Sequence, residues 1–348
     1  MQMKAILISF VSMFLPISLL AGDISITPMV GFPSSERGYE QGVSACYAGC
    51  IGDMLIMAGG ANFAEKPVAE GGKKCFYKGI YAAKITSADT LLWEKVGELP
   101  LAMAYGTTVA VGDRLILIGG SSAEGSLNSV FSLTMVQGKA EINELPSLPV
   151  ALDNMSAAIY NNKVYVAGGS SNGKEQAEVY VLDMKKRSPR WQRQKKHTAV
   201  PQRQRIGMQT VAVVPKGKLM ILGGYSSADG SHPAEVYDGP SGGALAQTSD
   251  GRIFVAGGVN HDIFLDAISG RYEFVAKDDY LKKPVEWYRF DGRLQQFDPT
   301  TCTYSTLVES PFLARAGAVL VAYKETIFSI GGETKPGIRS PLVVRVEL

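Results

Sequence analysis

Residues 54–60 read MLIMAGG, and five later segments repeat this pattern of an apolar strand that ends in Gly-Gly. The five are LILIGG (115–120), VYVAGG (164–169), LMILGG (219–224), IFVAGG (253–258) and IFSIGG (327–332). A turn-prone pair such as Gly112-Asp113 precedes each segment, and another short apolar strand precedes the turn. Two short strands joined by a tight turn form a β-hairpin. The sequence therefore predicts six hairpins.

Further strands follow several of these hairpins, for example at residues 80–85 and 93–98. Four antiparallel strands in each unit, with a unit about every 50 residues, are typical of the blades of a β-propeller. We therefore expect an all-β fold, a six-bladed β-propeller. The high glycine content, 38 residues without a collagen-like period, agrees with a fold that needs many tight turns.

Three features refine this prediction. The last unit reaches only a third strand at 342–348, and residues 24–33 supply a matching strand, so we expect the two ends of the chain to pair and close the ring. Only 34 residues separate Gly223 from Gly257, which predicts a thin fourth blade with a third strand near 234–237. In contrast, 74 residues separate Gly257 from Gly331, and the extra stretch at about 262–286 suits a short helical insert.

The first 22 residues have the layout of a secretory signal, with Lys4, then an apolar stretch from Ala5 to Leu20, then small residues. An uncleaved membrane anchor is the alternative interpretation. We expect a signal peptide over 1–22, one propeller domain over 23–348, export to the cell envelope, and no membrane contact after cleavage. The net charge of +2 gives no reason to expect a nucleic-acid partner. The oligomeric state is left open.

The cysteine and histidine residues do not suggest a metal site. The three histidines are scattered, and Cys46 and Cys50 have no second pair nearby. One disulfide, or thiols that only pack, are the two readings left open for the four cysteines, which are Cys46, Cys50, Cys75 and Cys302. We therefore predict no metal site.

Loops that follow the Gly-Gly pairs meet on one face of a propeller, and function gathers on such loops. The loop after Gly332 carries Glu333 and, across a Pro-Gly turn, Arg339. A carboxylate can shuttle a proton, and an arginine can bind a carboxylate with two parallel hydrogen bonds. The alternative reading of this loop is an exposed ion pair in a tight turn.

Two further groups of residues are candidates for substrate binding. The long loop after Gly60 carries Asn62, Lys73 and Lys74 and can act as a lid, with a solvated loop as the alternative interpretation. The segments that lead into the innermost strands carry Tyr105, Arg205 and Arg315, which are candidates for the mouth of the central channel, with a structural role as the alternative for each.

The Gly-Gly strand ends, with the later Tyr or Phe and Trp of each unit, resemble kelch repeats over nearly all of residues 24–348. Four separated motifs narrow this resemblance: GGETKPGIRS (331–340), AGGANF with EGGKK (58–63 and 70–74), AYG (104–106) and GGVNHDIF (257–264). Together they resemble the sialic acid mutarotases, kelch propellers of the bacterial envelope, in a cyclically permuted order.

The resemblance implies an isomerase without a cofactor that interconverts the anomers of N-acetylneuraminate or a related sialic acid. On the matching positions, Glu333 would be the general acid/base and Arg339 would bind the substrate carboxylate. Two other functions stay open. One is a propeller that binds carbohydrate or protein without catalysis. The other is a copper radical oxidase, which needs Tyr, His and Cys ligands.

Overall fold

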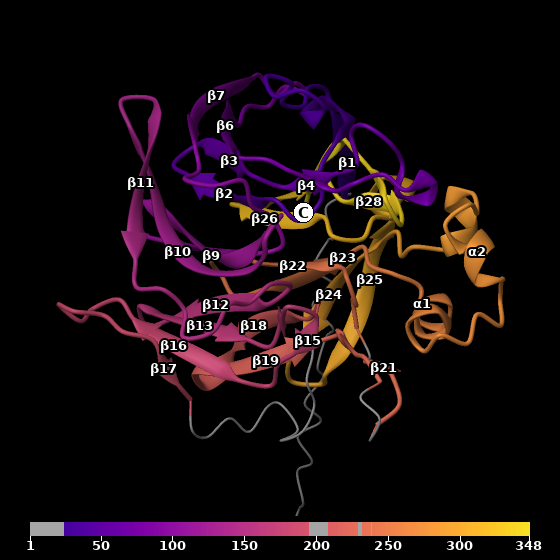
Figure 1. Cartoon of the computed structure of the whole chain (residues 1–348). Coiled ribbons are helices and arrows are strands. Elements are labelled where there is room, and N and C mark those ends of the chain that lie inside the picture. Colours follow the sequence, from indigo (N-terminus) through magenta and orange to yellow (C-terminus); the bar gives the residue numbers. More distant parts are fainter. Residues whose placement is uncertain (1–23, 195–207, 229–231, 238) are drawn as a thin grey trace, which may run out of the picture.

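The computed structural model describes residues 24–194, 208–228, 232–237 and 239–348, whose sheets surround a central channel (Figure 1). Five of its sheets have four antiparallel strands. The first two, each listed from the innermost strand outwards, are β2 (Tyr47–Ile51), β3 (Met54–Ala58), β6 (Gly79–Lys84), β7 (Trp93–Glu98); and β8 (Thr107–Val111), β9 (Arg114–Ser122), β10 (Gly125–Val136), β11 (Lys139–Leu145). The next two, in the same order, are β12 (Ser156–Tyr160), β13 (Lys163–Ala167), β16 (Val179–Asp183), β17 (Gln192–Arg193); and β22 (Ala244–Gln247), β23 (Ile253–Ala256), β24 (Arg293–Asp298), β25 (Thr303–Glu309). The last is β26 (Val319–Tyr323), β27 (Thr326–Ile330), β30 (Val343–Glu347), β1 (Ser25–Met29).

The prediction of six blades needs correction, because the described residues form five four-stranded blades. Within its described residues, the sheet of the fourth repeat is a hairpin of β18 (Thr210–Val214) and β19 (Lys218–Leu222), joined by the 3-10 turn η3 (Pro215–Gly217). The third strand expected near 234–237 does not join this hairpin. That segment contains β21 (Glu235–Val236), which pairs with β20 (Tyr225–Ser226) in a separate ribbon. The short stretch between the two Gly-Gly pairs is used for this ribbon and not for outer strands.

The Gly-Gly pairs are explained by how closely they approach the next blade. Gly59 and Gly60 both have positive φ, and a Cβ on Gly59 would lie 2.3 Å from the carbonyl oxygen of Met103. The N–H of Gly60 donates to that same oxygen at 2.9 Å. Because only glycine avoids this clash, each pair is the point where one repeat docks on another. In the same way the N–H of Gly332, in the last pair, donates to the carbonyl of Val43 in the first repeat.

Six residues at the starts of the innermost strands form a continuous circle of backbone hydrogen bonds. All six have φ between 50° and 66°, although four of them are not glycine. Each N–H donates to the carbonyl of the preceding member at 2.7 to 3.2 Å, and the circle returns to its first residue. Its members are Ala45, Tyr105, Asn154, Met208, Gly242 and Gly317. The residue that follows each member of this circle lines the central channel, whose volume is 780 Å³.

The predicted pairing of the chain ends is present in the structure. Strand β1 lies antiparallel to β30, with Ser25 opposite Glu347 and Met29 opposite Val343. Met29 is buried in an apolar cluster between the last and first sheets. Similar clusters fill the spaces between other neighbouring sheets. The fold therefore uses residues from both ends of the chain in one blade.

If this pairing is what closes the ring, loss of β1 will weaken the whole propeller. A chain that begins at Val30 leaves the edge of β30 unpaired and exposes the pocket of Met29. We expect its free energy of unfolding to be lower by about 3 kcal/mol or more, the usual cost of removing one large buried side chain. Urea unfolding measures this, with a chain that begins at Asp23 as the control. Equal midpoints would contradict a closing role for β1.

Short ribbons follow four of the Gly-Gly pairs and the helical insert follows a fifth, with α1 (His261–Ile268) and α2 (Lys277–Tyr280) at the right of Figure 1. The ribbons are β4 (Ala61–Asn62) with β5 (Cys75–Phe76), β14 (Ser170–Ser171) with β15 (Lys174–Glu175), β20 with β21, and β28 (Glu333–Lys335) with β29 (Ile338–Arg339). The predicted insert contains α1, α2 and the 3-10 turn η4 (Val285–Tyr288). The other 3-10 turns are η1 (Tyr39–Gln41), η2 (Val68–Glu70) and η5 (Pro311–Leu313). None of the helices described is long and apolar enough to cross a bilayer.

Candidate functional site

The ribbon β28–β29 brings Glu333 and Arg339 together. The two residues are directly paired in its register, and Arg339 Nη1 donates a hydrogen bond to Glu333 Oε2. The side chain of Arg339 is only 5% exposed, whereas that of Glu333 is 24% exposed. The reading of this loop as an exposed ion pair is therefore wrong. The structure instead has a shielded guanidinium and a carboxylate that still reaches solvent.

The Pro-Gly turn between them is fitted closely to a neighbouring loop. Gly337 has φ 85°, and a Cβ there would lie 2.1 Å from Val68 Cγ1 of η2. The N–H of Gly337 also donates to Glu333 Oε2 at 3.2 Å. Lys335 Nζ donates to the carbonyl of Lys283 in the insert at 2.7 Å. The Gly337 N–H thus holds the carboxylate of Glu333, and the Lys335 bond ties the ribbon to the insert.

Arg339 links this ribbon to loops of the first and second blades. Its Nε donates to the carbonyl of Ala61 at 3.3 Å, and its Nη2 donates to the hydroxyl of Tyr105 at 3.3 Å. The guanidinium carbon lies 5.4 Å from the centre of the Phe63 ring. A guanidinium has one N–H on Nε and two on each terminal nitrogen. The bonds to Glu333, Ala61 and Tyr105 therefore leave one N–H on each terminal nitrogen for a bound anion.

Tyr105 lies between two cations. Lys74 Nζ is 4.4 Å from the centre of its ring, and Arg339 contacts its hydroxyl. Burial raises the pKa of Tyr105, but the charges of Arg339 and Lys74 and hydrogen bonds with Lys74 and Ser44 lower it by more, so its pKa lies below the ordinary tyrosine value. The positive charge at this point therefore favours a negatively charged group.

This electrostatic environment predicts an early tyrosine titration. Because the pKa of Tyr105 is lower in the folded protein, the unfolded chain holds more protons between that pKa and about 10. The resulting stabilisation is complete above about pH 10 and is lost as the pH falls through the folded pKa. We expect the absorbance of tyrosinate at 295 nm to show a step that Tyr105→Phe removes and Arg339→Met moves to higher pH. A difference curve between wild type and Tyr105→Phe without any step below pH 10 would contradict this.

Asn62 has a structural role. It is 1% exposed, its amide nitrogen donates to the carbonyls of Gly38 at 2.8 Å and Gly42 at 2.9 Å, and its oxygen accepts from the Tyr77 hydroxyl at 2.9 Å. These bonds hold the loop before the first blade in place. The proposed site therefore does not include Asn62, contrary to the sequence prediction.

Arg315 also has a structural role, and its prediction as a substrate ligand needs the same correction. Its side chain is buried at 1% exposure, and burial lowers its pKa to about 10. Its terminal nitrogens donate to the carbonyls of Gly331, Leu342 and Ser329 and to the Ser329 hydroxyl. Arg315 therefore ties together strand ends inside the last blade and does not reach the channel mouth.

Of the remaining predicted site residues, some lie in the site and others do not. Lys74 joins the site through Tyr105, whereas Lys73 is exposed and takes no part in these contacts. Arg205 lies outside the described residues, as does the expected signal segment over 1–22.

The four cysteines are free, and burial raises the pKa of Cys46 and of Cys50 to about 12, as expected for packing thiols. Over the described ranges, no group of three or more His, Cys, Asp and Glu is arranged to hold a metal ion.

A cavity of 330 Å³ opens beside Glu333, between the ribbon β28–β29 and the insert. Sequence reasoning predicted the insert but not this cavity. The cluster of aromatic residues at 286–290, EWYRF, was the available signal, because aromatic side chains in a loop over a propeller face need something to pack on. Tyr288, at 1% exposure, packs edge-on against Tyr280 with ring centres 5.5 Å apart. Met208 of the hydrogen-bonded circle lines the cavity as well.

A β-propeller with loops of this kind defines the class of protein, and comparisons with known proteins narrow it. The model of the KLHDC2/KLHL20/DRC7 Kelch-repeats domain matches residues 42–239, and the model of N-acetylneuraminate epimerase matches residues 238–348. The chain therefore belongs to the kelch-repeat proteins, and its residues 238–348 are similar to the N-acetylneuraminate epimerases.

Individual relatives agree with this assignment. The chain is 28% identical over 247 residues to an N-acetylneuraminate epimerase of Shigella flexneri, and the aligned part covers 62% of this chain and 64% of the relative. It is 27% identical over 250 residues to the N-acetylneuraminate epimerase of Escherichia coli strain K12, and the aligned part covers 63% of this chain and 64% of that relative. The chain thus spans less than two thirds of the length of these relatives. The cyclically permuted order of the motifs stays a prediction.

Proposed function

We propose that this protein is a mutarotase that interconverts the anomers of N-acetylneuraminate or a closely related sialic acid. The similarity to the relatives supports this, since they carry the name N-acetylneuraminate epimerase. The observation that carries the proposal is the pairing of a partly exposed carboxylate, Glu333, with a shielded guanidinium, Arg339, at the edge of a cavity.

The chemistry requires one group that both takes and gives a proton. Glu333 removes the proton of the anomeric hydroxyl while the bond from the anomeric carbon to the ring oxygen breaks and a ketone forms. The ring oxygen takes up the proton from Glu333. Rotation of the open chain and the reverse steps give the other anomer, so that no proton is gained or lost. A positioned carboxylate is suited to this role.

The hydrogen bonds of Glu333 leave one oxygen for this task. Among the described residues, the donors to its side chain, Arg339 and Gly337, both bind Oε2. Oε1 is therefore the oxygen we assign to proton transfer. Arg339 would hold the substrate carboxylate through its remaining N–H groups, and Lys74 and Tyr105 would complete the anion site. The substrate would thus be bound next to the group that acts on it.

The test is the addition of pure α-N-acetylneuraminate to the protein, with the anomer proportions followed by proton NMR. We expect equilibration faster than in buffer alone, in proportion to the protein concentration. Saturable binding without acceleration would indicate a carbohydrate-binding propeller that is not an enzyme. We further propose that the protein acts in the bacterial periplasm, on the basis of the basic, apolar and small-residue pattern of residues 1–22.

A further inference from the structure

The cavity beside Glu333 has an unusual lining for a sugar site. Of the described residues that line it, only Glu333 is charged, and the wall opposite is mostly apolar. Helix α1 supplies Ile263, Phe264, Ala267 and Ile268 to this wall. Hydroxyl groups placed against such a wall would lose their hydrogen bonds to water without replacement. The cavity therefore favours an apolar group on whatever molecule reaches Glu333.

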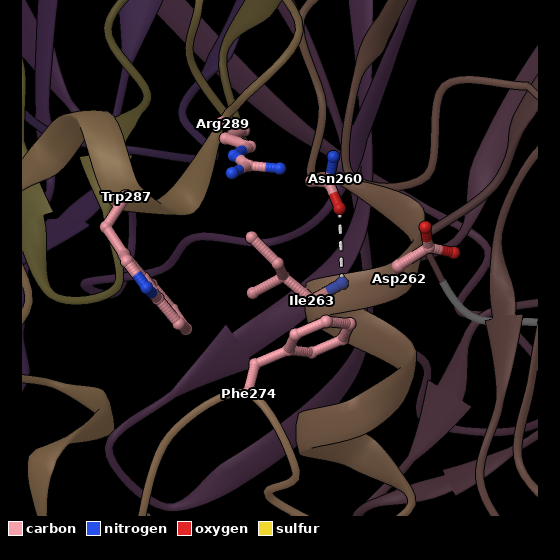
Figure 2. A pocket seen from close by; sticks show the side chains of 6 residues that line it. All are labelled: Asn260, Asp262, Ile263, Phe274, Trp287 and Arg289. Carbon is pink, nitrogen blue, oxygen red and sulfur yellow. Dashed lines mark hydrogen bonds between the residues drawn. The ribbon is translucent and has the colours of Figure 1, made fainter.

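The wall is built rigidly. Asn260 caps α1 by accepting a hydrogen bond from the N–H of Ile263 at 3.1 Å (Figure 2). The buried carboxylate of Asp266 accepts from the N–H groups of Glu273 at 2.9 Å and Phe274 at 3.1 Å, which fixes the turn after the helix. Figure 2 also shows Ile263, Phe274 and Trp287 around a smaller pocket, which shares Asn260 and Ile263 with this cavity. A wall held by such contacts keeps its shape when a ligand binds.

The geometry of a sialic acid matches the two sides of Glu333. Its carboxylate is attached to the anomeric carbon, and its acetamido group is attached to the ring carbon opposite. Glu333 both binds Arg339 and lines the cavity, whereas Arg339 is not part of the cavity lining. With the substrate carboxylate on Arg339 and the anomeric centre at Glu333, the substituent across the ring is the one that reaches the cavity.

We infer that the insert forms a specificity pocket for the N-acyl group of the sugar acid, through Ala267 and Ile268 of α1. This inference rests on the proposed mutarotase function and goes beyond it, because it selects N-acylated acids over acids with only hydroxyl groups. The methyl of the acyl group contacts the apolar wall, and the sugar hydroxyls stay on the open side of the cavity.

The inference is tested by comparing kcat/KM for anomer interconversion of N-acetylneuraminate and of the analogue with a hydroxyl in place of the acetamido group. We expect a preference for N-acetylneuraminate of about 10- to 100-fold, the range that one apolar group provides. Ala267→Leu narrows the pocket and should reduce this preference to about threefold or less. Ala276→Leu makes the same substitution at an exposed insert position outside the pocket, and should keep the wild-type preference.

A second variant guards against a misfolded first one. Ile268→Ala enlarges the pocket and should raise kcat/KM for an N-butanoyl substrate relative to N-acetylneuraminate by about tenfold. Equal wild-type rates on N-acetylneuraminate and its hydroxyl analogue would overturn the inference and leave the mutarotase proposal intact. No acceleration of either sugar would overturn both.

Discussion

Replacement of Glu333 by glutamine is expected to lower kcat for anomer interconversion by about 10²- to 10⁴-fold, the usual contribution of a general acid/base. Glutamine has nearly the same shape and can still accept the hydrogen bonds of Arg339 and Gly337 at the side-chain oxygen. It cannot exchange a proton with the substrate. The KM should therefore change little while kcat falls, as measured by NMR time courses at several substrate concentrations.

The matched control is Glu325→Gln, which makes the same change at a carboxylate that is 69% exposed and bound to Arg252. We expect wild-type kinetics for this variant. A Glu333→Gln protein that retains more than half of the wild-type kcat would remove Glu333 from the mechanism and leave the fold assignment untouched.

Replacement of Arg339 by methionine should have the largest combined effect on binding and stability. It removes the partner of Glu333 and the centre of the anion site, so we expect KM to rise about 100-fold. The free energy of unfolding should fall by about 2–3 kcal/mol, because the remaining carboxylate is left partly buried without its cation. The double variant Glu333→Gln/Arg339→Met should recover part of this loss, which a double-mutant cycle of urea unfolding measures.

Arg252→Met is the control for this prediction. Arg252 also forms ion pairs, with Asp250 and Glu325, but both of these carboxylates are more than half exposed. Surface ion pairs contribute about 0–1 kcal/mol, so the loss of Arg252 should lower the free energy of unfolding only slightly and leave KM unchanged. Equal losses for Arg252→Met and Arg339→Met would show that the pair with Glu333 has no special energetic role.

The repeat pattern allowed much of the fold to be predicted, because each Gly-Gly pair carries its own physical constraint. Gly59 has no room for a Cβ, and the same contact recurs at Gly331 with Val43. The pairing of β1 with β30 and the helical insert were also predicted correctly. The number of complete blades was not, because the sequence at 234–237 has the pattern of a strand but does not specify its partner.

The site was predictable only in part. Glu333 and Arg339 are close in sequence, so a turn was enough to bring them together. Arg315 and Asn62 looked like ligands because a polar residue near a strand end gives the same sequence signal whether it faces solvent or the interior. Their roles depend on carbonyls that come from distant segments, such as Leu342 for Arg315 and Gly38 for Asn62. Long-range contacts of this kind have no local sequence pattern.

The most direct test of the central claim, that Glu333 moves the proton which interconverts two anomers, is exchange spectroscopy by NMR on an equilibrated mixture of N-acetylneuraminate anomers. Wild-type protein at catalytic concentration should produce cross-peaks between the resonances of the α and β anomers, and Glu333→Gln should not. Cross-peaks of equal intensity with both proteins, or none with the wild type, would contradict the claim.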